Sequence, residues 1–322
     1  MKILANDGLS AAGIKALEAR GFEVITTKVA QEQVAAFINS NDIKILLVRS
    51  ATKVRRELMD ACPNLKVIGR GGVGMDNIDV ENAINRGIRV LNTPAASSES
   101  VAELVFAHLF SGVRFLHDAN RNMPLDGDTQ FEQLKKAYSG GTELRGKTLG
   151  IIGFGRIGQA VARIALGLGM QVLISTRSGK DGSVRLTFSD DRFLDFTLKN
   201  HTLDDLLSKS DFITLHVPAQ ECYLIGEREF GIMKDGVGII NCARGGLINE
   251  VELIGALEGG KVAFAGLDVF MDEPTPAVQI LMHPQISMSP HIGAATLEAQ
   301  DRISTELAEK IISLLDEGVL NV

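Results

Sequence analysis

The chain has 322 residues, of which 45% are hydrophobic and 23% charged. At about 150 residues per domain this length predicts two domains, and the composition is too apolar for a disordered protein. The 40 acidic residues outnumber the 33 basic ones and give a net charge of −7, which disfavours nucleic acid as the main partner because no overall positive field attracts a polyanion.

Short aliphatic runs alternate with longer helical patterns along the first third of the chain. This alternation is typical of βαβ units around a parallel sheet. The strands expected here are 2–4, 22–26, 43–48, 65–68 and 88–91, and the helices are 10–20, 31–40, 54–61 and 79–86.

A connector around Asn92 leads into a long apolar segment, residues 101–116. A helix that is apolar on nearly all sides must be covered on all sides. Two interpretations remain open, a central core helix and a subunit interface, and we expect a homodimer formed through the 98–120 region.

A second α/β unit begins near Lys147 and shows the same alternation of short aliphatic runs and helical patterns as the first. Residues 179–200 interrupt it with an alternating pattern that predicts a hairpin, and the chain ends in a helix over 299–315. The strands expected here are 148–152, 171–175, 212–216, 237–241, 262–267 and 286–288.

A glycine-rich turn follows the strand at 148–152 and opens a helix. Its glycines are Gly153, Gly155 and Gly158. In this context the pattern predicts a dinucleotide site, since the glycines allow a tight turn, close approach of the pyrophosphate and close helix packing, and the helix N-terminus attracts the phosphates. Residues 69–74 match the same pattern without a helix, so we interpret them as a cleft wall.

The strand after this turn lacks the acidic residue that normally binds the adenosine ribose. It is followed instead by Thr176, Arg177 and Ser178. Arg177 and the hydroxyl groups are suited to the 2′-phosphate of NADP, because a guanidinium binds phosphate oxygens in pairs. The alternative is that Arg177 is simply solvated.

Four polar residues follow three later strands, where an open α/β sheet presents its ligand crevice. They are Arg244, Asp268, Glu273 and His291. Hydride transfer from a secondary alcohol needs a base, a carboxylate that orients the base, and a cation for the substrate carboxylate. His291, Glu273 and Arg244 are candidates for these roles.

The three cysteines, Cys62, Cys222 and Cys242, are far apart and form no C-x-x-C pair. We therefore expect no disulfide framework and no metal site, and a reducing cytoplasm is the favoured location. The chain shows no signal peptide and no run of 18 apolar residues, so we expect neither secretion nor a membrane partner.

At these residues the sequence resembles the D-2-hydroxyacid dehydrogenases, and within them the D-3-phosphoglycerate dehydrogenases. The likeness extends over nearly the whole chain. The matching segments are 48–50, 69–79, 92–94, 100–103, 153–158, 210–218, 241–246, 267–270 and 290–294.

The resemblance implies a role for each candidate residue. Arg244 would bind the substrate carboxylate and keto oxygen, His291 would exchange the proton, and Glu273 would pair with His291 and favour its protonated form. The glycine-rich pattern predicts cofactor contacts at Gly153, Gly155 and Gly158, and the loop after the next strand predicts them at Thr176 and Arg177. The resemblance implies further cofactor contacts at Arg156, Ile157, Val217, Cys242, Ala243 and Asp268. The resemblance implies substrate contacts at Arg49, Ser50 and Arg244, and we also expect them at Gly72 and Val73, which lie in the cleft wall formed by residues 69–74.

The resemblance also implies the fold class, an α/β protein with two Rossmann-like or flavodoxin-like parallel-sheet domains and a deep cleft between them. Residues 1–97 and 291–322 would form the substrate-binding domain, and residues 98–290 the dinucleotide-binding domain. Because the chain stops at Val322, we expect no C-terminal regulatory domain.

The expected function is oxidation of 3-phospho-D-glycerate to 3-phosphohydroxypyruvate in serine biosynthesis, with NAD as cofactor, or NADP because Thr176 and Arg177 replace the ribose-binding acid. The expected partner is a small 2-hydroxy or 2-keto acid that carries a phosphate group. Ser97 stands where many phosphoglycerate dehydrogenases carry Asn. The alternatives are an NADPH-dependent hydroxypyruvate or glyoxylate reductase and a cofactor-gated protein resembling the corepressors of this family.

Overall fold

The computed structural model describes residues 1–318 and 320 and divides into two compact units. Unit 1 comprises residues 1–98 and 294–322, and unit 2 comprises Glu99–Gly293. His291, which the sequence placed in the first domain, lies in unit 2. Each unit contains one parallel sheet, which confirms the predicted α/β class. Within the described residues, no helix combines the length and apolarity needed to cross a membrane.

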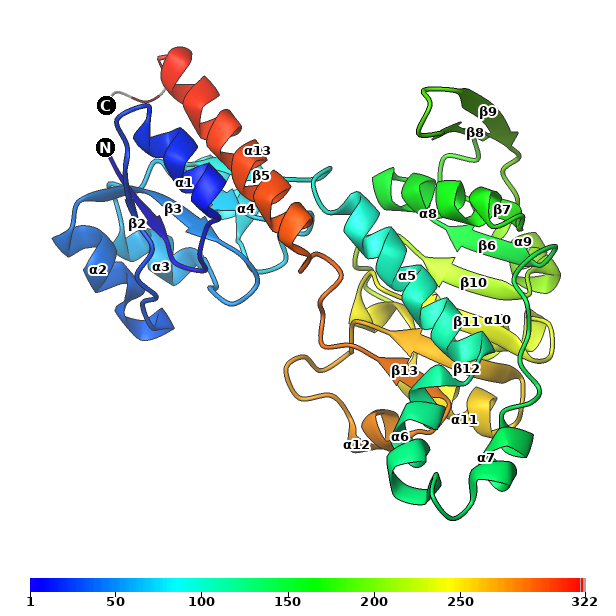
Figure 1. Ribbon diagram of the computed structural model, residues 1–322. Coiled ribbons are helices and arrows are strands. Elements are labelled where there is room, and N and C mark those ends of the chain that lie inside the picture. Colours follow the sequence, from blue (N-terminus) through cyan, green and yellow to red (C-terminus); the bar gives the residue numbers. More distant parts are fainter. Residues whose placement is uncertain (319, 321–322) are drawn as a thin grey trace. The chain divides into compact units, whose positions relative to one another are not determined.

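Unit 1 is a parallel sheet with helices on both faces (Figure 1). Its elements are β1 (Lys2–Ala5), α1 (Ala11–Glu18), β2 (Glu23–Ile25), η1 (Gln31–Gln33), α2 (Val34–Ser40), β3 (Ile43–Val48), α3 (Arg56–Ala61), β4 (Val67–Arg70), α4 (Val80–Asn85), β5 (Arg89–Asn92) and α13 (Leu297–Asp316). The strand order is β2-β1-β3-β4-β5.

The core of unit 1 follows from the alternation of side chains along its strands. Leu46 packs on one face with the helices α2 to α4, whereas Ile45 and Leu47 pack on the other face with α1 and α13. The two helices of that second face approach each other closely, since a Cβ added at Gly13 would lie 2.7 Å from the Cβ of Ser304.

Unit 2 contains a second parallel sheet and a separate hairpin (Figure 1). Its elements are α5 (Ser98–Val113), α6 (Leu116–Asp126), α7 (Phe131–Ala137), β6 (Thr148–Ile152), α8 (Arg156–Gly167), β7 (Gln171–Ser175), β8 (Gly182–Thr187), β9 (Phe193–Leu198), α9 (Leu203–Lys209), β10 (Phe212–Leu215), α10 (Glu227–Ile232), β11 (Val237–Asn241), η2 (Gly245–Leu247), α11 (Glu250–Glu258), β12 (Val262–Leu267), α12 (Val278–Met282) and β13 (Ile286–Met288). The strand order is β13-β12-β11-β10-β6-β7.

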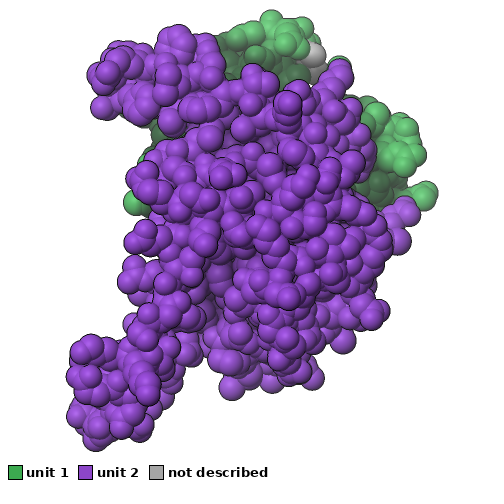
Figure 2. Space-filling view, turned by 90° about the vertical axis from the view of Figure 1, so that its right-hand side faces the viewer, with its two compact units in different colours: residues 1–98, 294–322 green, residues 99–293 purple. Residues whose placement is uncertain are grey.

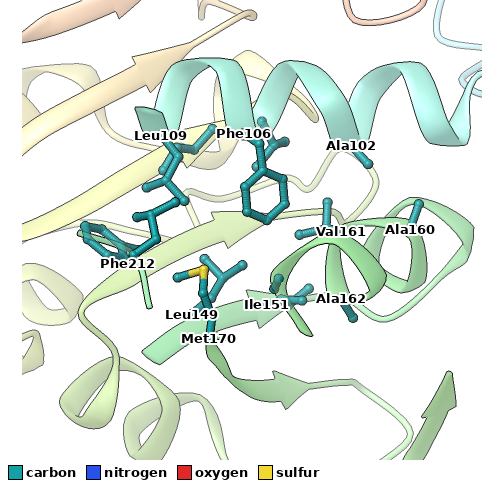
Figure 3. Packing of buried hydrophobic residues seen from close by; sticks show 14 of the residues in the cluster. Ala102, Phe106, Leu109, Leu149, Ile151, Ala160, Val161, Ala162, Met170 and Phe212 are labelled. Atoms are coloured by element: carbon teal, nitrogen blue, oxygen red, sulfur yellow. The ribbon is translucent and has the colours of Figure 1, made fainter. Parts of the chain in front are cut away.

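The long apolar segment is not one continuous helix. α5 ends at Val113, and Phe115 adopts a left-handed conformation with φ 55° before α6 begins. One face of α5 packs into the core, where Phe106 and Leu109 lie against β6 and α8 (Figure 3). Phe110 points outward and is 41% exposed. The core-helix interpretation therefore applies to the inner face of α5.

The predicted hairpin forms as β8 and β9, an antiparallel pair beside α8. The chain returns from it at Asn200, which pairs with Ile174 of β7 in a single parallel bridge. The hairpin thus occupies the stretch of chain where a Rossmann fold of strand order 3-2-1-4-5-6 would place its third strand.

The strand order reverses once in each sheet, and ligands of open α/β sheets bind at the carboxyl ends of the strands at such a point. In unit 1 the reversal lies between β1 and β3, and in unit 2 it lies between β6 and β10. The loops that follow these four strands are therefore the natural places for ligand contacts.

Candidate active site

The glycine-rich turn lies at the reversal point of unit 2 and connects β6 to α8. Gly153 has φ +93°, and a Cβ there would lie 2.4 Å from the carbonyl oxygen of His216. A Cβ at Gly158 would lie 2.3 Å from the carbonyl oxygen of Gly153, whereas nothing lies within 4 Å of a Cβ at Gly155. Two glycines are thus needed for packing, and Gly155 leaves open space beside the N-terminus of α8, as a pyrophosphate requires.

The remaining predicted cofactor residues surround this turn or follow neighbouring strands. Arg156 and Ile157 form the first turn of α8, which has no side-chain cap at its N-terminus. Val217 follows β10 and packs over Gly153. The unpaired helix N–H groups and the exposed Arg156 together favour an anion at this position.

The loop after β7 is held by a residue from the far end of the hairpin. The side-chain oxygen of Asn200 accepts hydrogen bonds from the backbone N–H of Thr176 at 2.8 Å and from its hydroxyl at 2.9 Å. The backbone N–H of Asn200 in turn donates to Asp181 at 2.8 Å. Arg177 and Ser178 are exposed at the tip of this fixed loop.

Arg244 projects from a turn that follows β11. The side chain of Asn241 braces this turn, because its oxygen accepts from the N–H of Ala243 at 3.0 Å and its amide donates to the Arg244 carbonyl at 2.8 Å. Gly245 lets the turn press against the segment that leads to Glu273, since a Cβ there would lie 1.8 Å from the carbonyl oxygen of Phe270.

Glu273 and His291 form a hydrogen-bonded pair in unit 2. The Nδ1 atom of His291 lies 2.7 Å from Oε2 of Glu273, and Oε1 of Glu273 accepts from the N–H of Phe270 at 3.0 Å. The pair is partly exposed, at 45% and 35% of the two side chains. With Nδ1 engaged, the Nε2 atom of His291 is the one that can exchange a proton with a ligand.

Asp268 follows β12 and is only 1% exposed. Its carboxylate accepts hydrogen bonds from the backbone N–H groups of Ile292 and Gly293, both at 2.8 Å. It lies close enough to Cys242 to contribute, after burial, to raising the pKa of that thiol well above its ordinary value. Cys242 is therefore a neutral packing residue beside the site.

The predicted substrate residues of unit 1 follow β3 and β4. The carboxylate of Asp7 accepts from the N–H of Arg49 at 2.7 Å and from that of Thr52 at 3.0 Å, which fixes the loop carrying Ser50. Gly72 accepts from the N–H of Thr93 at 3.1 Å. Arg49 is half-buried, and burial lowers its pKa against the attraction of Asp7.

Val73 lies in the second of these loops, beside Gly72, and is 37% exposed. Its carbonyl accepts from the side-chain amide of Asn92 at 2.9 Å. This bond fixes the loop at the carboxyl end of β4, the position expected of a substrate contact.

Comparison with known proteins identifies the family to which this fold and these residues belong. Residues 106–293 match the NAD binding domain of the D-isomer specific 2-hydroxyacid dehydrogenases. The chain belongs to this family. It is an NAD(P)-dependent 2-hydroxyacid dehydrogenase, and the resemblance inferred from the sequence is confirmed.

Individual relatives of this 2-hydroxyacid dehydrogenase carry different substrate names. Hydroxypyruvate reductase of Thermotoga maritima is 42% identical over 85% of each chain. D-3-phosphoglycerate dehydrogenase of Methanocaldococcus jannaschii is 39% identical over 100% of this chain and 60% of its own length. An NADPH-dependent glyoxylate/hydroxypyruvate reductase of Sinorhizobium meliloti superposes with a TM-score of 0.79 at 27% identity, covering 98% of this chain and 95% of the other.

The structure also adds residues to the site that sequence patterns did not single out. Asn241 and Asn200 brace two of its loops, and nothing in their spacing distinguishes them from other loop asparagines.

His216 is not a competing base, because burial lowers its pKa to about 3 and its Nε2 atom bonds the hydroxyl of Thr214 at 3.0 Å. Among the described residues, no group of three or more acidic, histidine or cysteine side chains is placed to hold a metal ion.

Proposed function

We propose that the protein is a D-3-phosphoglycerate dehydrogenase, which oxidises 3-phospho-D-glycerate to 3-phosphohydroxypyruvate at the entry to serine biosynthesis. The observation that carries this proposal is Arg49, a half-buried cation at the reversal point of the unit 1 sheet. An unphosphorylated acid presents one anionic group, for which Arg244 suffices, whereas a phosphorylated acid presents a second. The match to a phosphoglycerate dehydrogenase over the full chain supports the same substrate.

The residues of unit 2 divide the chemistry among them. Arg244 binds the substrate carboxylate through its guanidinium fork, which also orients C2. In the oxidative direction the neutral imidazole of His291 accepts the C2 hydroxyl proton at Nε2, and Glu273 stabilises the imidazolium that results. Asp268 retains unused acceptor capacity for the carboxamide of the nicotinamide, since a carboxylate has about four acceptor positions. When bound, the nicotinamide ring accepts or supplies the hydride.

A second candidate, an NADPH-dependent hydroxypyruvate or glyoxylate reductase, is favoured by the loop after β7. The exposed Arg177 and Lys180 flank the hydroxyl of Ser178, and no carboxylate ends the strand. This combination suits a 2′-phosphate, which two cations and a hydroxyl can bind. The relative described above that is 42% identical to this chain is also named a hydroxypyruvate reductase.

One assay separates the two candidates. Oxidation of NADH or NADPH is followed at 340 nm with phosphohydroxypyruvate, hydroxypyruvate or glyoxylate as substrate. We expect phosphohydroxypyruvate to give the highest kcat/KM. Preference for an unphosphorylated acid with NADPH would overturn the first candidate in favour of the second.

Two substitutions test the residues on which the candidates rest. Arg49→Gln is expected to lower kcat/KM for phosphohydroxypyruvate by about 10- to 100-fold, the effect of losing one hydrogen bond to a charged group, and to leave hydroxypyruvate nearly unaffected. Arg56→Gln, at an exposed arginine of the same unit, is the control. Arg177→Gln should weaken NADPH relative to NADH, with Arg192→Gln at the exposed hairpin tip as control.

The proposal includes a homodimer formed through the 98–120 region and the helices that follow it. None of the residues in α6 and α7 is buried, and this part of unit 2 projects as a lobe at the bottom of Figure 2. Its exposed apolar side chains include Leu116, Leu125 and Phe131, which a second copy would cover. Light scattering should give a dimer for the wild type and a monomer for Leu125→Glu, whereas Ile84→Glu in unit 1 should leave the dimer intact.

A further inference from the structure

His108 occupies an unusual position for a polar residue. It is buried at 4% exposure within the apolar helix α5, yet both nitrogens of its ring are hydrogen-bonded. Nδ1 lies 2.9 Å from the hydroxyl of Ser287, and Nε2 lies 2.9 Å from the hydroxyl of Ser289. The helix comes close to the sheet here because β12 carries Gly266, where a Cβ would lie 2.6 Å from that of His108. His108 and the two serines thus form a specific polar contact between α5 and the sheet, which otherwise pack through apolar side chains.

The donor and the acceptor in each of these hydrogen bonds follow from the contact between Ser289 and Asp268. The hydroxyl of Ser289 lies 2.6 Å from Oδ1 of Asp268, and a carboxylate can only accept. Ser289 therefore donates to Asp268, so its oxygen accepts the Nε2–H of His108. In the neutral ring Nδ1 is then an acceptor, and we assign the proton of the Ser287 hydroxyl to this contact because the other neighbour of that hydroxyl, Ser111, is more distant at 3.4 Å. Burial lowers the pKa of His108, against the attraction of Asp268, which favours this neutral form.

Asp268 in turn holds the segment that carries the catalytic histidine. Three successive backbone N–H groups donate to it at 2.8 Å, that of His291 to its carbonyl, that of Ile292 to Oδ1 and that of Gly293 to Oδ2. His291 has φ +54°, a left-handed conformation that is strained for a residue other than glycine and persists only where its surroundings enforce it. The carboxylate of Asp268 thus holds the two residues that directly follow His291, and its main chain holds His291 itself.

We propose that His108 and Ser289 are positioning residues for the proton transfer at His291. Through Ser289, His108 holds Asp268 in the orientation that fixes residues 291–293. The inference rests on the proposed function only in taking His291 as the group that exchanges the proton. Ser287 contacts the same imidazole on its other side and does not contact Asp268, so it provides a matched control.

The test compares four variants of the full chain: Ser289→Ala, His108→Leu, His108→Gln and the control Ser287→Ala. For Ser289→Ala and His108→Leu we expect kcat to fall by about 10- to 100-fold, since misplacing a reacting group by about 1 Å has effects of this size, while KM for the keto acid stays within about threefold because Arg244 is untouched. His108→Gln can still donate to Ser289 and should restore most of kcat. Ser287→Ala should resemble the wild type.

A second measurement does not depend on activity. Amide hydrogen exchange is followed in peptides that cover residues 290–294, where the amides of Ile292 and Gly293 are hydrogen-bonded to Asp268. We expect faster exchange in Ser289→Ala and His108→Leu and unchanged exchange in His108→Gln and Ser287→Ala. If His108→Leu is poorly folded, the exchange rates of Ser289→Ala still test the proposal, because that substitution removes only one hydroxyl group.

The outcomes separate this inference from the proposed function. If Ser289→Ala matches Ser287→Ala in both kcat and exchange, or if His108→Gln is as impaired as His108→Leu, the positioning role is refuted. If the wild type turns over none of the keto acids, the proposed function fails, and the exchange pattern alone then supports or overturns the positioning of residues 291–293.

Discussion

Replacing Gly155 by alanine should weaken cofactor binding without weakening the fold. Gly155 has φ −75° and ψ −162°, which any residue adopts, and nothing lies within 4 Å of the added Cβ. Alanine restricts the unfolded chain, which stabilises by about 0.4–1 kcal/mol, and is a poorer N-cap than glycine by a similar amount. The two effects nearly cancel, so the melting temperature should stay close to that of the wild type.

The Cβ would nevertheless stand where a pyrophosphate must approach the backbone to within about 3 Å of an N–H group. Loss of one hydrogen bond to a charged phosphate costs about 1.5–3 kcal/mol, which corresponds to about 10- to 100-fold in the dissociation constant. Titration of NADH and NADPH by fluorescence, together with thermal unfolding, measures both quantities. Unchanged cofactor affinity in a folded Gly155→Ala protein would refute the placement of the pyrophosphate at this turn.

Two alanine substitutions in the same helix serve as controls. Gly167→Ala also meets nothing within 4 Å; it should leave the affinity unchanged and raise the stability by about 0.4–1 kcal/mol, because no N-cap is altered there. Gly158→Ala would place its Cβ 2.3 Å from the Gly153 carbonyl oxygen, an overpacking that costs about 1–3 kcal/mol and lowers the melting temperature by roughly 2–12 °C. Gly158 should therefore show its effect in stability as well as in binding.

Three further predictions concern catalysis and thiol chemistry. His291→Ala should lower kcat by about 10²- to 10⁴-fold, and near-normal turnover would contradict its role as proton carrier. Arg244→Lys keeps the charge but loses the bidentate fork, so kcat/KM should fall mainly through KM; an unchanged kcat/KM would argue against carboxylate binding there. Burial raises the pKa of the Cys62 and Cys242 thiols, so at pH 8 iodoacetamide should label only the exposed Cys222 in the native protein, as mass spectrometry would show.

Hydrophobic periodicity was sufficient to predict most of the secondary structure. Strands such as β3 and β11 are buried along most of their length, so they appear as continuous aliphatic runs bounded by polar residues. The break between α5 and α6 could not be predicted in this way, because Phe115 takes up a left-handed conformation that no local residue signals. An apolar pattern also cannot tell which face of α5 the sheet covers and which face stays exposed.

The residues of the candidate site also divide into those that a sequence pattern predicts and those that only the fold reveals. Arg244, Glu273 and His291 were predicted because each follows a strand, and the carboxyl ends of parallel strands meet at one edge of a sheet. The structure brings Glu273 and His291 into direct contact. Asn200 and His108 could not be recognised, because each acts through a partner distant in sequence, Thr176 and Ser289, that only the fold brings near.

The candidate residues fall into two groups, one in each unit, and this grouping has a consequence for specificity. The glycine-rich turn and the residues proposed for proton transfer and carboxylate binding all belong to unit 2. The loop that carries Arg49, at the reversal point of the unit 1 sheet, is held by Asp7 of the same unit. Because a substrate is chosen by differences in binding at groups that do not react, substitutions around Arg49 should change which 2-keto acid is preferred and leave hydride and proton transfer intact. Relatives named for different acids can therefore share the chemistry of one NAD binding domain.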